Sequence, residues 1–500
     1  MKLSSILQKI TTEYQIKQGE DLIKQAEIQD VAIDSRLVEE KSDAIFFALE
    51  GADTNGEKFI PSAIKQGAKV IIAKKFFEND AKGVIFLITN DPFNFLVETL
   101  QVFYQNLPQN IYAVTGTNGK TSTVEFTRQI FELMGVKAAS IGTLGLVCDH
   151  IIENGFVDSS LTTPDIVGLY KNLSILKKNG VDHVAIEASS IGLDQKRMAG
   201  IEIKNAAFTN FSQDHLDYHD NMEEYFAAKN ILFKGVLPDS SKVTLNSDIE
   251  EFSVLKGICE AKNHQIIDYG KNGALKIENV IEKDHGQEIE ISYQDENYKF
   301  FININVNFQV FNLVCALGLI LNDLGLSKQK LEELFEKFDQ LESAAGRMQK
   351  IANHKGAQIF IDYAHTPDAL EISLKNARKL SPKRLIVLFG CGGDRDQLKR
   401  PQMCDAACQN ADLVIVTDDN PRTEDPAKIR SEIMANCDLK KAVEVPGRKD
   451  AIEKSLQMLK KGDIIILAGK GHEKYQSING QKIDFDEVRI VKKFITNKGR

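Results

Sequence analysis

The segment "VTGTNGKTS", residues 114–122, decides how the middle of the chain folds. An apolar run leads into it, so we expect a strand over 111–115 and a helix over about 121–134. Gly116 and Gly119 let backbone amides between these elements face an anion, and the helix start adds its positive dipole end. The segment predicts a phosphate-binding turn. A plain strand–helix turn is the alternative, because Val114 stands where the general P-loop has a glycine.

Side chains around this turn can supply further contacts to phosphate and magnesium. Lys120 can reach the outer phosphates of a nucleoside triphosphate, and the Thr121 hydroxyl can ligate magnesium. Magnesium prefers oxygen ligands, and Glu187 at the end of "DHVAIE" can supply another. The alternative for Glu187 is a solvated carboxylate at a strand end. The segment "DHLDYH", residues 214–219, is either a transition-metal site or a polar loop.

Length and charge exclude several classes of protein. The 500 residues suggest about three domains at roughly 150 residues each. A net charge of -9 without a dense Lys/Arg run argues against a nucleic-acid partner. No uncharged apolar stretch approaches the ~20 residues of a membrane helix, and the N-terminus lacks the apolar core of a signal peptide. We therefore expect a cytoplasmic protein without membrane insertion, and a monomer.

The cysteines predict neither a disulfide framework nor a zinc site. Their number is odd, their spacing is scattered and no C-x-x-C occurs, so reduced thiols fit better. The positions are Cys148, Cys259, Cys315, Cys391, Cys404, Cys408 and Cys437.

Composition breaks divide the chain into three predicted domains. The polar segments "NLPQN" (106–110) and "DQLESAAGR" (339–347) separate domains at 1–108, 109–340 and 341–500. In the last domain, strands alternate with helical patterns, which implies a parallel sheet with ligands at the carboxyl ends of its strands. Those strands end in the polar loops "GCGGDRD", "TDDNPR" and "AGKGHE". We expect an α/β protein with a central P-loop-type mononucleotide-binding parallel sheet and a C-terminal Rossmann-like domain.

Several motifs together, in family order, resemble the Mur ligase family of ATP-dependent amide-forming enzymes in peptidoglycan precursor synthesis. The central motifs are "TGTNGKTS", "TTPD" (162–165), "EASS" with "GLDQKR" (187–197), "TNFSQDHLDYH" (209–219) and "YFAAK" (225–229). The later motifs are "GRM" (346–348), "DYAHTPDAL" (362–370), "GCGGDRD" (390–396), "DNPR" (419–422) and "GKGHE" (469–473). "DSR" (34–36) with its flanks resembles the uridine-binding first domain of the family.

The motif "DNPR" carries the substrate expectation. Within the family it marks ligases that add meso-2,6-diaminopimelate to UDP-N-acetylmuramoyl-L-alanyl-D-glutamate. Arg422 can bind the distal carboxylate of that diamino acid through a bidentate fork, whereas it would repel the ammonium of lysine. The alternative for Arg422 is an ion pair with Glu424 or Asp425. The resemblance implies that diaminopimelate contacts Arg395, Asn420, Arg422, Gly469 and Glu473.

The resemblance also assigns the other ligands. For ATP it implies Gly116, Thr117, Asn118, Gly119, Lys120, Thr121, Ser122, Asn312, Arg347, Asp362 and His365. For the UDP-muramoyl dipeptide it implies Ser35, Thr162, Thr163, Ser189, Gln195 and Arg197. The sequence departs from the family at Ile191, often histidine, and at Val306 and Gln309, usually glycine and asparagine.

The resemblance implies that the catalytic residues are Lys120, Glu187, His215 and Lys229. It implies that the magnesium ligands are Thr121, Glu187, His215 and Lys229. In the family, the lysine of "YFAAK" is carbamylated by carbon dioxide and becomes an oxygen ligand for a second Mg²⁺. This modification requires the neutral amine, so we expect Lys229 to be partly buried with a lowered pKa. In isolation, a helix lysine is a solvated side chain.

The expected reaction consumes ATP. The D-glutamate side chain takes the γ-phosphoryl group, and the amine of diaminopimelate then attacks the resulting acyl phosphate. ATP, Mg²⁺ and the small-molecule substrates are the expected ligands. A lysine-adding muramyl ligase and a folylpolyglutamate synthetase-like ligase are the near alternatives. A P-loop motor or switch ATPase and a non-catalytic nucleotide-binding module are more distant ones.

Overall fold

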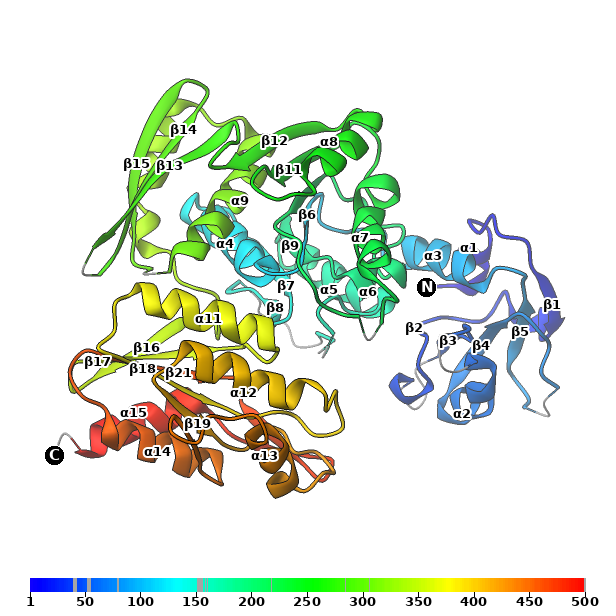
Figure 1. Cartoon of the computed structure of the whole chain (residues 1–500). Coiled ribbons are helices and arrows are strands. Elements are labelled where there is room, and N and C mark those ends of the chain that lie inside the picture. Colours follow the sequence, from blue (N-terminus) through cyan, green and yellow to red (C-terminus); the bar gives the residue numbers. More distant parts are fainter. Residues whose placement is uncertain are drawn as a thin grey trace. The chain divides into compact units, whose positions relative to one another are not determined.

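The computed structural model describes all residues except 39–42, 52–54, 79–80, 151–155, 158, 160, 217, 284, 305 and 499–500. Its internal contacts define two units. Unit 1 comprises Met1–Lys120, Phe131–Ile267 and Asn322–Leu324, and unit 2 comprises Thr121–Ile130, Asp268–Leu321 and Gly325–Arg500. Parallel sheets in both units confirm the α/β class (Figure 1). The predicted boundaries of three domains stay a prediction.

Unit 1 begins with a five-stranded sheet of order β1-β5-β4-β3-β2. The bounds are β1 (Gln15–Gln18), β2 (Asp30–Ala32), β3 (Ala44–Phe47), β4 (Ala68–Ala73) and β5 (Ile85–Ile88). Strands β2 to β5 run parallel, and β1 is antiparallel to β5. The helices are α1 (Leu3–Leu7), α2 (Ile60–Gln66) and α3 (Pro92–Phe103). Helix α2 is capped at its C-terminal end by Gly67, whose φ of 117° suits glycine.

The second sheet of unit 1 carries the glycine-rich turn. Six consecutive strands of this sheet, which has ten strands in all, have the order β11-β10-β6-β9-β7-β8. The bounds are β6 (Asn110–Thr115), β7 (Ala138–Gly142), β8 (Gly145–Val147), β9 (His183–Glu187), β10 (Asn205–Phe208) and β11 (Lys242–Asn246). All pairs are parallel except β7–β8. In register, Val114 of β6 pairs with Glu187 and Thr115 pairs with Phe208. The carboxyl ends of β6, β9 and β10 therefore share one edge.

Helices connect these strands in the way that parallel pairing requires. Their bounds are α4 (Lys120–Leu133), α5 (Ile166–Lys178), α6 (Ser190–Asp194), α7 (Met222–Ile231) and α8 (Phe252–Ala261). The predicted strand at 111–115 and helix at 121–134 are confirmed as β6 and α4. α4 begins directly after the glycine turn, and β6 is almost fully buried. Strand β12 (Gln265–Gly270) crosses from unit 1 into unit 2.

Unit 2 contains an antiparallel set of strands and a long apolar helix. The bounds are β13 (Leu275–Lys283), β14 (Gly286–Tyr293), β15 (Glu296–Ile302), α9 (Asn307–Leu324) and α10 (Lys328–Phe335). By length and composition alone, α9 could cross a membrane, with a mean hydropathy of 1.3. The sequence prediction overlooked it. Because 67% of the helix is buried inside the protein, it also fits a core helix.

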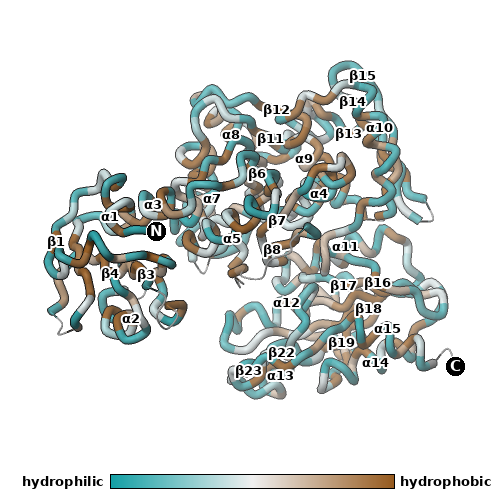
Figure 2. The backbone as a smooth tube through the Cα atoms, turned by 180° about the vertical axis from the view of Figure 1, so that it is seen from behind, coloured by the Kyte–Doolittle hydropathy of each residue, from teal (hydrophilic) through white to brown (hydrophobic). Residues whose placement is uncertain are grey.

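The C-terminal sheet of unit 2 has the order β16-β17-β21-β18-β19-β20. The bounds are β16 (Gln349–His354), β17 (Ala357–Asp362), β18 (Arg384–Phe389), β19 (Leu413–Val416), β20 (Ala442–Glu444) and β21 (Asp463–Ala468). All pairs are parallel except β16–β17. The chain is hydrophobic along β17 and β18, which supply part of the buried core (Figure 2).

Helices and a hairpin complete this part of unit 2. The bounds are α11 (Pro367–Lys379), α12 (Lys399–Asn410), α13 (Pro426–Met434), α14 (Arg448–Met458), α15 (Glu487–Lys498), β22 (Tyr475–Ile478) and β23 (Gln481–Asp484). The expectation of fully reduced cysteines is wrong, because Cys404 of α12 and Cys437 form a disulfide. Spacing along the sequence gave no sign of this pair, which the packing of α13 against α12 brings together.

Candidate active site

The glycine-rich turn is held by the loop that follows β10. Thr117 donates its backbone N–H to the Asn210 carbonyl at 2.8 Å, and the Asn118 N–H donates to the Asn210 side chain at 2.8 Å. The Thr209 hydroxyl donates to the Asn118 carbonyl at 2.6 Å. Gly116 has a φ of 138°, and a Cβ there would lie 2.0 Å from the Thr209 hydroxyl oxygen. Only glycine therefore fits at residue 116 without moving this support.

Two lysines meet at this turn. Lys120 donates to the carbonyls of Gly116 and Thr117 at 2.9 and 2.7 Å. Lys229 of α7 donates to the same Gly116 carbonyl at 2.8 Å and is 1% exposed, so the solvated alternative for this lysine is wrong. Burial lowers the pKa of Lys229 well below its ordinary value, and the Lys120 charge lowers it further. The geometry favours a neutral Lys229 amine.

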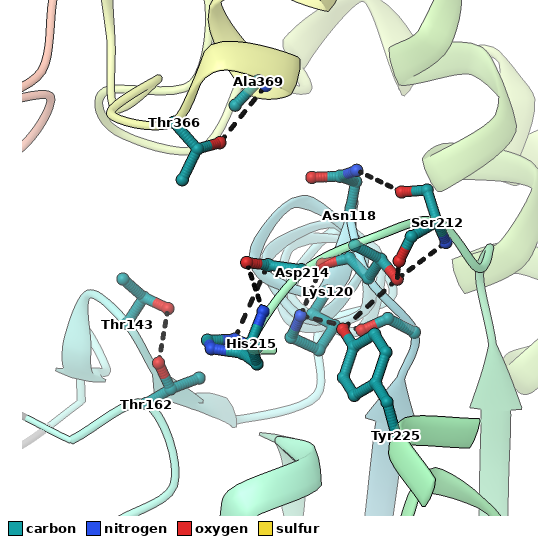
Figure 3. A network of polar contacts seen from close by, with 12 residues as sticks. Asn118, Lys120, Thr143, Thr162, Ser212, Asp214, His215, Tyr225, Thr366 and Ala369 are labelled. Atoms are coloured by element: carbon teal, nitrogen blue, oxygen red, sulfur yellow. Dashed lines mark hydrogen bonds and ion pairs between the residues drawn. The ribbon is translucent and has the colours of Figure 1, made fainter. Parts of the chain in front are cut away.

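Tyr225 connects the turn to the loop that contains His215 (Figure 3). Its hydroxyl donates to the Thr117 hydroxyl oxygen at 3.3 Å, and Lys229 Nζ lies 4.2 Å from its ring centroid. The ring of His215 lies 6.0 Å from the Tyr225 ring. His215 Nε2 lies 3.6 Å from Asp214 Oδ2. The motif "YFAAK" thus supplies Tyr225, a contact of the turn that the sequence did not predict.

Glu187 is buried at the end of β9 rather than solvated, since it is 1% exposed. Its carboxylate accepts the Thr143 backbone N–H at 2.8 Å and the Thr143 hydroxyl at 3.2 Å. Thr143 was not identified from the sequence, and no spacing pattern pointed to it. Within the described part of the chain, no ion pair to Glu187 is found. A buried carboxylate held by neutral donors suits a bound cation.

Except for Ser35, the residues predicted to bind the UDP-muramoyl dipeptide belong to the hydrogen-bond network around Glu187 and Thr143. The Thr163 hydroxyl donates to the Glu187 carbonyl at 2.7 Å and lies 2.9 Å from the Ser189 hydroxyl, which caps α6. Arg197 donates to the Thr163 carbonyl at 2.8 Å and to Gln195 at 2.6 Å. Thr162 lies 3.4 Å from the Thr143 hydroxyl. Buried Ser35 begins a short 3₁₀ helix, Ser35–Leu37.

The histidines and aspartates of 214–219 do not form a metal site of three or more ligands among their described members. Asp217 lies outside the described residues. The transition-metal alternative for this segment therefore gains no support from the described side chains.

In unit 2, Arg347 is the centre of the predicted adenosine contacts. Its Nη2 donates to the Thr121 hydroxyl at 3.2 Å, and its guanidinium lies 4.8 Å from the Tyr363 ring centroid. Gln309, a departure from the family pattern, donates to the Arg347 carbonyl at 3.4 Å and accepts from Asn312 at 3.0 Å. The altered residue thus connects two predicted ligands.

Asp362 and His365 follow β17. Asp362 is buried and accepts the N–H groups of Met348 and Tyr363 at 3.3 and 2.9 Å. Burial raises the pKa of Asp362, and hydrogen bonds and the Arg347 charge oppose this effect. His365 is exposed, and its Nδ1 lies 2.9 Å from the Tyr363 carbonyl.

Two further residues predicted to bind ATP flank the start of α4. In unit 1, Asn118 is exposed, and in unit 2, Ser122 is buried in the first turn of α4.

Four of the five predicted diaminopimelate contacts lie in loops after β19 and β21. Asn420 donates to Glu473 at 2.9 Å and accepts from Lys470 at 3.0 Å. Lys470 is fully buried and lies 3.1 Å from Glu473. Gly469 has a φ of 107°, and a Cβ there would lie 2.7 Å from the Asp419 carboxylate. The fifth contact, Arg395, is exposed in the loop after β18.

Arg422 is held by backbone contacts rather than by an acidic neighbour. Its Nη1 donates to the Gly393 carbonyl at 2.6 Å. Its backbone, with a φ of 51°, pairs with the β22–β23 hairpin through Ser477 and Asn479 at 2.9 and 2.6 Å. The alternative ion pair with Glu424 or Asp425 is wrong, because Glu424 pairs with Arg400 at 2.8 Å and Asp425 caps α13. That pairing holds the pKa of Glu424 at about 2.

Three family models match the chain. They are described as "Mur ligase family, catalytic domain" at residues 27–94, "Mur ligase middle domain" at 114–320, and "Mur ligase, glutamate ligase domain" at 346–471.

Relatives and solved structures agree with these matches. The chain is 39% identical to the "UDP-N-acetylmuramoyl-L-alanyl-D-glutamate--2,6-diaminopimelate ligase" of Rickettsia montanensis, covering 95% of this chain and 97% of the relative. The ligase of that name from Rhizobium meliloti (strain 1021) is 40% identical, covering 93% and 94%. A solved structure of a ligase with that name is 31% identical with a TM-score of 0.64, covering 97% and 98%. The chain belongs to the Mur ligase family.

Proposed function

We propose that this chain is an ATP-dependent ligase that adds meso-2,6-diaminopimelate to UDP-N-acetylmuramoyl-L-alanyl-D-glutamate during peptidoglycan synthesis. Identity of 39% to a relative with that printed name, across 95% of the chain, supports the reaction. The observation that supports the amino-acid specificity is the placement of Arg422. Its backbone pairs with the β22–β23 hairpin, and it lies in the same loop as Asn420. No carboxylate of a neighbouring residue is found paired with Arg422 in the described contacts, so its charge suits an incoming carboxylate.

The first step forms an acyl phosphate. The D-glutamate side-chain carboxylate attacks the γ-phosphorus of ATP, the bond to the β,γ-bridging oxygen breaks, and ADP leaves. Lys120 stabilises the charge that spreads over the transferring phosphoryl oxygens, and the amides of the glycine turn hold the phosphates in line. Thr163, Ser189 and Arg197 are the proposed holders of the sugar-peptide substrate. Arg347, Asn312, Asp362 and His365 are proposed to hold the adenosine.

The second step forms the amide. The amine of diaminopimelate attacks the acyl carbon, and the tetrahedral intermediate expels inorganic phosphate. Arg422, Arg395, Asn420, Gly469 and Glu473 orient the amino acid, with Glu473 suited to its distal ammonium and Arg422 to its distal carboxylate. No protein nucleophile takes part, so positioning and electrostatics account for most of the rate.

The residues at the glycine turn fit Mg²⁺. Glu187 is a buried carboxylate held by neutral donors, and a neutral Lys229 amine can react with carbon dioxide to give an anionic oxygen ligand. Thr121, Glu187, His215 and carbamylated Lys229 are the proposed ligands. Bound Mg²⁺ would neutralise phosphate charge.

A monomeric state, a cytoplasmic location and the absence of nucleic-acid partners stay predictions.

The test compares two amino acids. Purified protein is given ATP, Mg²⁺ and the UDP-muramoyl dipeptide, and ADP release is followed with meso-diaminopimelate or L-lysine. We expect turnover with diaminopimelate and about 100-fold less with lysine, in line with loss of a charged contact. Arg422→Ala should lose this discrimination, whereas Arg378→Ala, an exposed arginine in the same unit, should keep it. Equal turnover with lysine would support the lysine-adding alternative instead.

A further inference from the structure

A cluster of three cysteines lies in unit 2, outside the proposed active-site residues. Cys404 and Cys408 are one helical turn apart on α12, and their sulfurs are 3.9 Å apart. Cys437 follows α13, where its N–H donates to the Met434 carbonyl at 3.1 Å. All three sulfurs lie within 4.8 Å of one another, and no other group of three His, Cys, Asp or Glu ligands converges in this way among the described residues.

The cluster is partly open to solvent. Cys404 and Cys408 are buried, and Cys437 is half-buried, so solvent can reach the cluster from one side. Lys441 donates to the Cys408 carbonyl at 2.8 Å, which keeps its ammonium beside the cluster.

In this structure Cys404 and Cys437 are joined as a disulfide. A dithiol reductant can open it. The reductant transfers two electrons and two protons, the Cys404–Cys437 bond breaks to give two thiols, and the reductant becomes a disulfide. The reduced chain then presents three thiols at one place.

We propose that the reduced Cys404, Cys408 and Cys437 form a binding site for one thiophilic divalent ion of the zinc class. A Zn–S bond is about 2.3 Å long, so two sulfurs on one ion can be at most about 4.6 Å apart. The Cys404–Cys408 separation of 3.9 Å is within this limit. Each thiol that binds releases its proton, and the half-buried side leaves the fourth position of the ion to water.

The ion would link α12 to the end of α13, and each of these helices follows a loop of the proposed active site. Arg400 at the start of α12 pairs with Glu424 and Glu432 at 2.8 and 2.5 Å, and α13 follows the loop of Arg422. The three cysteines lie farther along the chain in each of these two helical segments. An ion bound to them would therefore link the segments at a second place. We therefore expect metal binding and disulfide formation to exclude each other, because both use Cys404 and Cys437.

The experiment uses Co²⁺ as a spectroscopic probe with full-length protein reduced by a dithiol, which is then removed under nitrogen. We expect thiolate-to-cobalt charge-transfer absorption that saturates at about one ion per chain and is displaced by Zn²⁺. Cys408→Ser should weaken binding about ten-fold or more, whereas Cys148→Ser, a cysteine outside the cluster, should bind as the parent does. No thiolate band in the parent, or equal binding by Cys408→Ser, would overturn the proposal.

A second measurement does not depend on a folded variant. The reduced parent is exposed to oxidised glutathione with and without Zn²⁺, and the Cys404–Cys437 disulfide is quantified by peptide mapping. We expect Zn²⁺ to slow formation of this disulfide about ten-fold or more, because the ion holds both thiolates. An unchanged rate would contradict a shared site.

Discussion

Lys120 and Lys229 donate to the same carbonyl oxygen, that of Gly116, at 2.9 and 2.8 Å. Two ammonium groups at one acceptor repel each other, and the cost of charge is greater for the lysine that is removed from water. That lysine is Lys229, which is 1% exposed. Lys229 is therefore the lysine of this pair whose pKa is lowered by burial, and it is the amine that we propose to react with carbon dioxide.

The first prediction concerns the proposed carbamate. Lys229→Ala should lower kcat about 100-fold or more, because the variant loses an anionic ligand near the transferring phosphoryl group. Added formate or acetate should restore part of the rate by supplying the missing carboxylate oxygens. Lys234→Ala removes an exposed lysine shortly after α7 and should keep full activity. Failure of every short carboxylate to restore activity, with folding intact, would argue against a carbamate.

The second prediction is a pH dependence of stability. The folded-state pKa of Lys229 is lowered below 10.5, so the unfolded chain takes up a proton that the folded chain does not hold. The free energy of unfolding therefore rises with pH between the two pKa values, by about 1.4 kcal/mol per pH unit. In buffer free of carbon dioxide, unfolding of the parent and of Lys229→Met is compared at several pH values. Their difference should grow in favour of the parent as pH rises, and a flat difference would mean a charged Lys229.

The position of the glycine turn could be predicted from the sequence because its signals are local. Apolar residues before Gly116 and amphipathic spacing after Lys120 define the strand and the helix without reference to the rest of the chain. The start of α13 also depends on local preferences, because Asp425 and Pro426 each favour the start of a helix.

Contacts between distant segments could not be predicted in this way. Thr143 lies on a different strand connection from Glu187, and only the parallel pairing of β7 with β9 brings them together. The Cys404–Cys437 disulfide depends on how α13 packs and returns the chain. Single residues with no periodic or spacing signal become recognisable only when the sheet order is known.

The third prediction concerns Thr143. Thr143→Val keeps the shape of the side chain and the backbone N–H but removes the hydroxyl that donates to Glu187 at 3.2 Å. We expect kcat to fall about ten-fold, because one lost hydrogen bond to a buried charged group is worth roughly 1.5–3 kcal/mol when fully formed. Steady-state kinetics at saturating substrates measure this. Thr11→Val, an exposed threonine distant in sequence, should be neutral for kcat.

The fourth prediction assigns Lys470 as a positioning residue for the amino-acid site. Its ammonium orients Asn420 and Glu473 at 3.0 and 3.1 Å. Lys470→Met should raise the KM for diaminopimelate about ten-fold or more, because Glu473 loses the buried ammonium that orients it, and should leave the KM for ATP unchanged. Lys474→Met changes an exposed lysine and should leave both values unchanged. An equal rise in both KM values would indicate general loss of structure instead.

The last prediction tests the stability of the C-terminal sheet. Arg448 is buried and donates to Glu487 at 2.8 Å and to the Ala468 carbonyl, at the end of β21, at 2.7 Å. Arg448→Met leaves Glu487 buried without its cation, so unfolding of the full chain should become easier by about 3–5 kcal/mol. Arg489→Met breaks a pair that is exposed on both sides and should give no measurable change. Replacing Glu487 by Met in the Arg448→Met chain should recover part of the loss, because the Glu487 charge is then gone while Asp419, 3.7 Å from Arg448 Nη1 in the parent, stays without this partner. Calorimetry of the parent and of the single and double variants measures this recovery, and a double variant less stable than Arg448→Met would show that the cost lies in packing rather than in charge.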